Sequence, residues 1–151
     1  MLNAKELENI FSSSLLCDLY FNEFIFGSTR KIIGAILIFD DFRLISIRLD
    51  DCGVGFIFEE KIPNELKMGK YGFTKIKSVK SYFQDIELPA LIRSIDVRDH
   101  VDSYDDCGIG LNPIKIHLAG EWEIRILNRD DEMIVQISRN GKIKGMTLPE
   151  R

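Results

Sequence analysis

Short runs in which apolar and polar residues alternate recur along this chain, and they constrain its fold more than any other feature. Residues 45–49, 114–118 and 122–126 each place an apolar side chain at every second position, the period of a strand with one solvated face. Residues 32–39 are apolar at nearly every position, which is typical of a central strand covered on both faces. Asn140-Gly141 is the strongest hairpin signal in the chain. The pattern predicts antiparallel strands joined by short turns.

Two segments instead favour helices. Residues 4–16 carry apolar side chains at helical spacing, namely Leu7, Ile10, Phe11 and Leu15. Pro89 suits the first turn of a helix, so residues 88–95 are predicted to form a second, short one. We therefore expect an α+β fold, with an antiparallel, strongly curved sheet or half-barrel of about seven to nine strands. The N-terminal helix would pack across one face of that sheet.

The chain has 151 residues, of which 45% are hydrophobic, enough for one domain with its own core. No linker divides it, so residues 1–151 are expected to form a single domain. Its longest apolar stretch, residues 32–39, is too short to cross a bilayer, which takes about 20 residues. Lys5, Glu6 and Glu8 precede any apolar run, unlike a signal peptide, and three cysteines favour reduced thiols. We expect a cytoplasmic protein without a membrane partner.

One sequence pattern occurs twice, at residues 49–56 and 104–111, and suggests an internal two-fold duplication around a shared Asp-Asp-Cys-Gly element. If both copies met in space near His100, their carboxylates and thiols could hold the metal of a small metal-dependent hydrolase. The ligand types conflict, because carboxylates suit calcium or magnesium whereas thiolates suit zinc. Tight turns explain the same residues, since Asp caps its own backbone and Gly adopts positive φ. We therefore expect no cofactor, no metal and no catalytic residue.

Residues 61–80 contain six Lys and one Glu, together with Tyr71 and Phe73. Aromatic rings on a basic sheet are typical of single-stranded nucleic-acid binding, so a nucleic-acid-binding module at residues 67–80 is one alternative function. The chain as a whole carries a net charge of −4, which gives no global attraction for a polyanion. Lysines that guard a strand edge against pairing with another chain explain the same residues. We therefore expect no nucleic-acid partner.

Negative charge is concentrated in the second half of the chain. Residues 81–132 hold twelve acidic and five basic side chains. Five aspartates fall within eleven residues, relieved only by Arg98: Asp96, Asp99, Asp102, Asp105 and Asp106. These residues either form ordinary solvated turns or a surface complementary to a basic partner, since clustered charge speeds encounter and discriminates against wrong partners.

In its small size, acidic character and acidic turns, at Asp50-Asp51, at residues 96–106 and at residues 130–132, the chain resembles the bacterial immunity proteins of contact-dependent growth inhibition. The resemblance implies a one-to-one complex with a cognate toxin domain, often a nuclease, whose basic surface the acidic side chains would cover. It implies a binding protein, not an enzyme, and leaves its oligomeric state open. The partner-binding residues would be Asp96, Asp99, Asp102, Tyr104, Asp105 and Asp106, with Tyr104 as an aromatic anchor.

Overall fold

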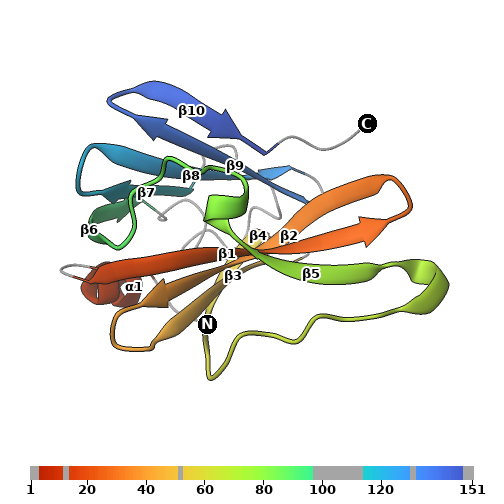
Figure 1. The fold of residues 1–151 in the computed structure, drawn as a ribbon. Helices are drawn as coiled ribbons and strands as arrows, with labels where there is room; N and C mark the ends of the chain where they lie inside the picture. Colours follow the sequence, from red (N-terminus) through yellow and green to blue (C-terminus); the bar gives the residue numbers. More distant parts are fainter. Residues whose placement is uncertain (1–3, 12–13, 51–52, 97–113, 130–131, 148–151) are drawn as a thin grey trace.

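The computed structural model describes residues 4–11, 14–50, 53–96, 114–129 and 132–147, and a closed β-barrel forms its centre (Figure 1). One helix, α1 (Ala4–Phe11), precedes ten strands and two single 3-10 turns in these residues. The strands are β1 (Leu15–Phe26), β2 (Thr29–Phe39), β3 (Leu44–Asp50), β4 (Gly53–Glu59), β5 (Phe73–Ser78), β6 (Ala90–Asp96), β7 (Ile114–Leu118), β8 (Trp122–Arg129), β9 (Glu132–Arg139) and β10 (Lys142–Met146). The 3-10 turns are η1 (Gly69–Tyr71) and η2 (Val79–Ser81).

Six strands close the barrel in the order β1, β2, β9, β8, β7 and β6. Closure occurs where Ile32 of β2 pairs with Met133 of β9. The other strands extend from the barrel: β3 and β4 continue from β2, β10 from β9, and β5 pairs with β1. All ten strands therefore belong to one connected, antiparallel sheet.

The two longest strands, β1 and β2, form part of the barrel and also project beyond it. The first residues of β1, Leu15 and Leu16, pair with β6, whereas residues 20–25 pair with β5. As a result, the far halves of β1, β2 and β5 form a three-stranded arm that ends in η1 (Figure 1). We call residues 23–31 and 65–77 the arm.

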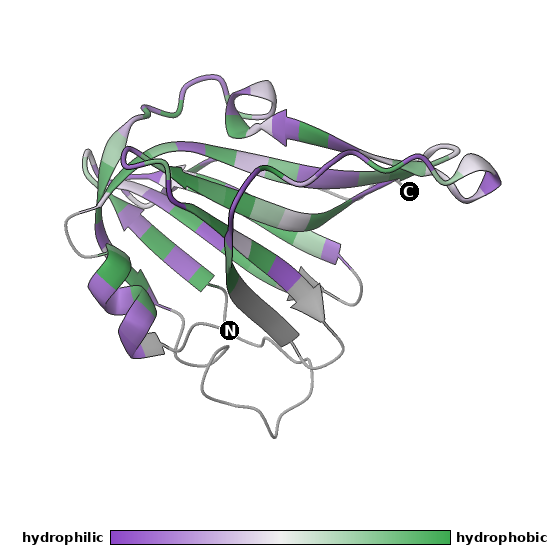
Figure 2. Ribbon diagram, turned by 90° about the horizontal axis from the view of Figure 1, so that it is seen from below, coloured by the Kyte–Doolittle hydropathy of each residue, from purple (hydrophilic) through white to green (hydrophobic). Residues whose placement is uncertain are grey.

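Alternation along the strands produces the barrel core. Hydrophobic and hydrophilic residues alternate along the barrel wall in Figure 2, and on β7 the side chains at 114, 116 and 118 are buried while those between them are half-buried. The largest fully buried side chains come from α1 and from several strands: Leu7, Phe11, Leu16, Leu19, Phe21, Ile36, Leu37, Phe39, Ile45, Ile47 and Ile114. All of them except Ile36 pack into one connected cluster.

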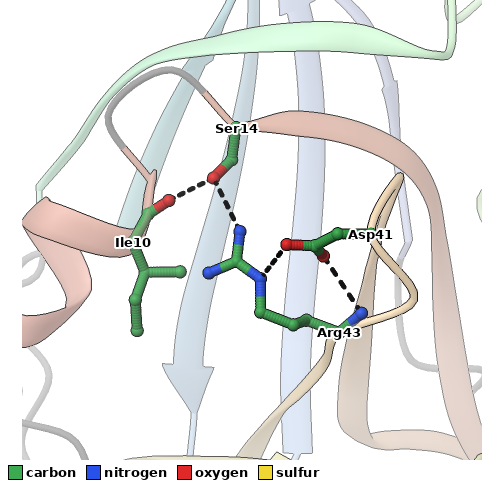
Figure 3. Close-up of polar contacts among 4 residues, drawn as sticks. All are labelled: Ile10, Ser14, Asp41 and Arg43. Atoms are coloured by element: carbon green, nitrogen blue, oxygen red, sulfur yellow. Dashed lines mark hydrogen bonds and ion pairs between the residues drawn. The ribbon is translucent and has the colours of Figure 1, made fainter.

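Polar contacts fix the end of α1 against the sheet (Figure 3). The Ser14 hydroxyl donates a hydrogen bond to the Ile10 carbonyl and accepts one from Arg43 Nη2 at 3.3 Å. Arg43 also pairs with Asp41, its Nε lying 2.5 Å from Oδ2. The guanidinium therefore ties the β2–β3 turn to the segment between α1 and β1. No helix of the described residues is long and apolar enough to cross a membrane.

The predicted α+β character is confirmed in its broad form, but the sheet is larger than expected. It has ten strands in the described residues, against the predicted seven to nine, and the six-stranded centre is closed where an open curved sheet or half-barrel was expected. The extra strand is β6, in the segment predicted as a helix. Barrel closure depends on a pairing between residues about a hundred positions apart, Ile32 and Met133, which periodicity does not reveal.

The predicted helix at residues 88–95 is wrong. Pro89 follows a cis peptide bond from Leu88, and the chain then enters β6. Ala90, Ile92 and Ile95 are buried, with an irregularity between residues 92 and 94 that shifts the alternation by one. This spacing resembles a helical repeat in the sequence. The strand forms because β6 fills the gap between β1 and β7, where its backbone groups find partners.

The N-terminal helix is confirmed but ends earlier than predicted, at Phe11 rather than Leu16. Leu15 and Leu16 instead begin β1, where they pair with Leu91 and Ala90. The predicted hairpin at Asn140-Gly141 joins β9 to β10, and both residues have positive φ, 52° and 76°.

Candidate partner-binding surfaces

Of the acidic residues predicted to bind a partner, Asp96 lies within the described residues. It ends β6, is exposed, and stands opposite Lys115 of β7 in the strand register. The others lie outside the described residues: Asp99, Asp102, Tyr104, Asp105 and Asp106. The second Asp-Asp-Cys-Gly copy and His100 lie outside them as well.

Two acidic segments are attached to the same end of one wall of the barrel. Asp96 ends β6 and Ile114 begins β7, so residues 97–113 connect these two strand ends. Ile114 stands opposite Ile126, close to the end of β8 at Arg129, where the next acidic turn begins. Successive antiparallel strands place alternate connections at one end, and both acidic connections fall on that end.

The third acidic turn is attached nearby through β2. Ile32 of β2 pairs with Met133, the second residue of β9, and Gly34 of the same strand pairs with Arg48 of β3. The end of β3 at Asp50 is therefore close to the start of β9. We call the strand ends at Asp50, Asp96 and Glu132 the acidic end of the barrel.

A second surface, on the arm, combines cations with aromatic rings. Partners in an antiparallel register share a face, and one row of such partners runs Lys67, Phe73, Ile25, Arg30 across neighbouring segments. The next row contains Lys75, opposite Glu23. We call Arg30, Lys67, Phe73, Lys75 and the η1 residues Lys70 and Tyr71 the basic–aromatic face.

The rings of this face are solvent-exposed and lie next to lysines. Tyr71 is 67% exposed and Phe73 is 37% exposed. The Lys70 ammonium lies 5.2 Å from the Tyr71 ring centre, and that of Lys75 lies 5.7 Å from the Phe73 ring centre. Other large apolar side chains of the arm are exposed as well: Phe26, Leu66 and Met68. Folding gains little from such exposure, so the arm is a candidate contact surface.

Hydrogen bonds join β5 to the segment that precedes it in the arm. Thr74 N donates to the Leu66 carbonyl at 2.8 Å, and Leu66 N donates to Thr74 Oγ1 at 2.7 Å. Met68 N donates to the Gly72 carbonyl at 2.9 Å. Gly72 has φ +100°, and a Cβ there would lie 2.4 Å from the Ile25 carbonyl oxygen. The exposed rings therefore stand on a braced segment instead of a free loop.

A buried carboxylate anchors the base of the arm to the barrel. Glu23 is 3% exposed and accepts a hydrogen bond from the Tyr82 hydroxyl at 2.5 Å. Its other contacts are Lys77 Nζ at 3.1 Å and Arg30 Nη1 at 3.8 Å. Burial alone raises the pKa of Glu23, but these hydrogen bonds and charges outweigh it, so the pKa is below its ordinary value. Burial, and next Glu23 itself, raise the pKa of Tyr82.

Polar side chains also form a ladder on the outer wall of the barrel. Ser94, His117, Glu123 and Ser138 stand opposite one another on successive strands and line a surface pocket of about 330 Å³. His117 Nδ1 is 3.6 Å from one Glu123 oxygen, and Arg125 Nε contacts the other. His117 is half-buried beside this carboxylate. We interpret the ladder as cross-strand polar pairing that stabilises the wall.

Within the described residues, no cluster of three or more His, Cys, Asp or Glu side chains could hold a metal ion. Cys17 is a free, half-buried thiol of β1, whereas Cys52 and Cys107 are outside the described residues. A scan against protein-family models and searches of curated proteins and of solved structures find no significant match to this chain.

Sequence reasoning identified the lysines and rings of residues 67–80 but missed their partner on the adjoining hairpin. Arg30 is more than thirty positions away and joins the row only through the β1–β2 and β1–β5 registers. The sequence-based prediction also treated Lys77 as an available cation, whereas Lys77 pairs with buried Glu23. The alternation of Phe73, Lys75 and Lys77 was the one signal in the sequence that these side chains share a face.

Proposed function

We propose that this protein is a binding protein of the immunity type, which neutralises a cognate toxin domain by covering a basic surface with its acidic end. One observation carries the proposal: three acidic segments far apart in the sequence are attached to neighbouring strand ends at Asp50, Asp96 and Glu132. Acidic segments attached to neighbouring strand ends would be complementary to a basic groove.

The sequence of the attached segments supports this reading. Residues 96–106 contribute Asp96, Asp99, Asp102, Asp105 and Asp106, with Tyr104 among them. Like charges held close together destabilise a fold unless a partner neutralises them, so such a concentration favours binding over a purely structural role. A nuclease toxin is the expected partner class, because carboxylates can occupy sites built for phosphates.

Co-purification tests the proposal. The tagged chain would be co-expressed with the reading frame immediately upstream in its own genome, and complex formation and growth would be followed. We expect a toxic neighbour, rescued growth and a one-to-one complex whose dissociation constant rises with salt concentration.

The contribution of the acidic end would be measured with the triple variant Asp96→Lys, Asp99→Lys, Asp102→Lys. Its matched control carries the same charge change on exposed residues elsewhere: Glu60→Lys, Asp85→Lys, Glu121→Lys. We expect at least a hundredfold weaker binding for the first and less than about threefold for the second, since close charge pairs are worth roughly 1.5–7 kcal/mol. Equal effects of the two triples, or a harmless neighbour that does not bind, would refute the proposal.

A further inference from the structure

We propose that the basic–aromatic face binds single-stranded nucleic acid, through a surface distinct from the acidic end. Three arguments carry this inference: cations and a ring from separate segments share one face, the cations are accessible to a ligand, and the exposed rings and lysines favour a nucleic acid over an acidic protein.

The first argument is the arrangement across the strands. Lys67, Phe73 and Arg30 occupy one register row, and Lys75 occupies the next. Buried Ile25 separates Phe73 from Arg30, so the row holds two cations and one ring, which can engage phosphates and a base of the same strand together. Lys70 and the exposed Tyr71 lie next to each other in η1, at the tip of the arm (Figure 1).

The second argument is that the local charge is available to a ligand. Glu23, the one buried carboxylate among the described residues of the arm, is paired most closely with Lys77 and Tyr82 and more distantly with Arg30. Lys67, Lys70 and Lys75 are exposed, and Arg30 is half exposed at 51% with its nearest Glu23 oxygen 3.8 Å away. Charges are screened over about 8 Å at physiological ionic strength, so the chain's net charge of −4 does not cancel this local excess.

The third argument distinguishes between partner classes. Every base offers a flat face for stacking on Tyr71 and Phe73, whereas lysine is depleted at protein–protein interfaces. Phe73 and Lys75 lie at alternate positions of one strand, and Lys67 stands opposite Phe73. These observations favour an extended polyanion with aromatic bases over an acidic protein.

Fluorescence anisotropy with a labelled oligothymidine 20-mer tests the proposal on the full chain. We expect saturable binding in low salt. The logarithm of the association constant should fall linearly with the logarithm of salt concentration, with a slope of about −2.8 if four cations contact phosphates. The double variant Lys67→Glu, Lys75→Glu would make that slope shallower, about −1.4, and would weaken binding at least tenfold. Lys77 is left unchanged because it anchors Glu23.

Two comparisons separate stacking and local charge from general attraction. Tyr71→Ala would weaken binding by about 5- to 150-fold, the range of one base–ring stack, while Tyr71→Phe would retain it. The double variant Lys5→Glu, Lys142→Glu makes the same charge change on exposed residues of α1 and of the start of β10, and would have little effect. Circular dichroism would confirm that each variant is folded.

Several outcomes would overturn the inference. One is the absence of binding at 20 mM salt. Another is equal weakening by the two lysine double variants, which would mean non-specific attraction. A third is the combination of two results: Tyr71→Ala leaves binding unchanged, and polyglutamate binds as tightly as the oligothymidine. That combination would assign the face to acidic proteins instead. None of these outcomes bears on the acidic end, so the toxin-binding proposal is judged separately.

Discussion

Glu23 shows how one residue connects the barrel to its arm. Isolated buried carboxylates are strongly disfavoured, yet this one lies in β1 between the core residues Phe21 and Ile25. It is tolerated because Tyr82 and Lys77 supply a hydrogen bond and a charge from the segment that follows β5 and from β5 itself. The same contacts lower the pKa of Glu23, so the residue remains ionised and holds the arm in place.

Replacing this carboxylate should make stability less dependent on pH. A carboxyl group whose pKa is lowered by folding stabilises the protein above its unfolded pKa, about 4.3, and that contribution is lost as pH falls through the folded pKa. We expect Glu23→Gln to lower the free energy of unfolding by about 1–3 kcal/mol at pH 7. The difference from the wild type should shrink below about pH 4.

Urea unfolding at a series of pH values measures this difference. Glu60→Gln is the control, because Glu60 is an exposed carboxylate, and its curve should parallel that of the wild type. A constant gap between Glu23→Gln and the wild type from pH 7 to pH 3 would contradict the assigned role of Glu23.

At the scale of single elements, β5 depends on a glycine that its sequence does not explain. Gly72 precedes β5, and its backbone approaches the Ile25 carbonyl so closely that no side chain fits. Gly69, three residues earlier, also has positive φ, +59°, but has open space around it. The two glycines look equivalent in the sequence and differ only in what β1 places beside them.

This pair predicts unequal effects of the same substitution. Gly69→Ala should cost about 1–2 kcal/mol, the conformational penalty of a left-handed residue. Gly72→Ala should cost about 3 kcal/mol or more, because the new Cβ also pushes β5 away from β1. Hydrogen exchange would measure the loss of protection at the amides of Met68 and Thr74, both of which are hydrogen-bonded within the arm. Similar protection in both variants would show that the close approach is not required.

β6 illustrates the limit of reasoning about elements one at a time. Leu88, Leu91, Ile92 and Ile95 have spacings that fit one face of a helix. The structure instead buries Ala90, Ile92 and Ile95 on a strand with one irregular step. Local spacing fits both patterns, and the choice depends on β1 and β7, which leave open backbone groups on either side.

At the scale of the whole molecule, the barrel is closed by a single pairing between distant residues. Ile32 is 5% exposed and Met133 is 1% exposed, and their backbones join β2 to β9. Truncating this contact should destabilise the entire fold rather than one strand, because the six barrel strands share one core.

Ile32→Ala should lower the free energy of unfolding by about 2–5 kcal/mol, the range of a buried isoleucine truncation. Ile143→Ala removes the same atoms from an exposed position of β10, 61% accessible, and should change stability by less than about 0.5 kcal/mol. Thermal unfolding followed by circular dichroism distinguishes the two. An unchanged thermal unfolding transition in Ile32→Ala would contradict the inference that the contact between β2 and β9 stabilises the whole barrel.

The sequence by itself determined the strand-rich composition, the N-terminal helix and the Asn140-Gly141 turn, because these depend on local periodicity and on backbone φ preferences. It also showed that charge is unevenly distributed. Only the tertiary structure decided that the barrel is closed, that residues 90–96 form a strand, and that Arg30 joins Lys67 and Phe73. Each of these depends on pairings between residues distant in sequence, whose register no local pattern encodes. For the same reason, the attachment of three acidic segments to neighbouring strand ends became visible only in the folded chain.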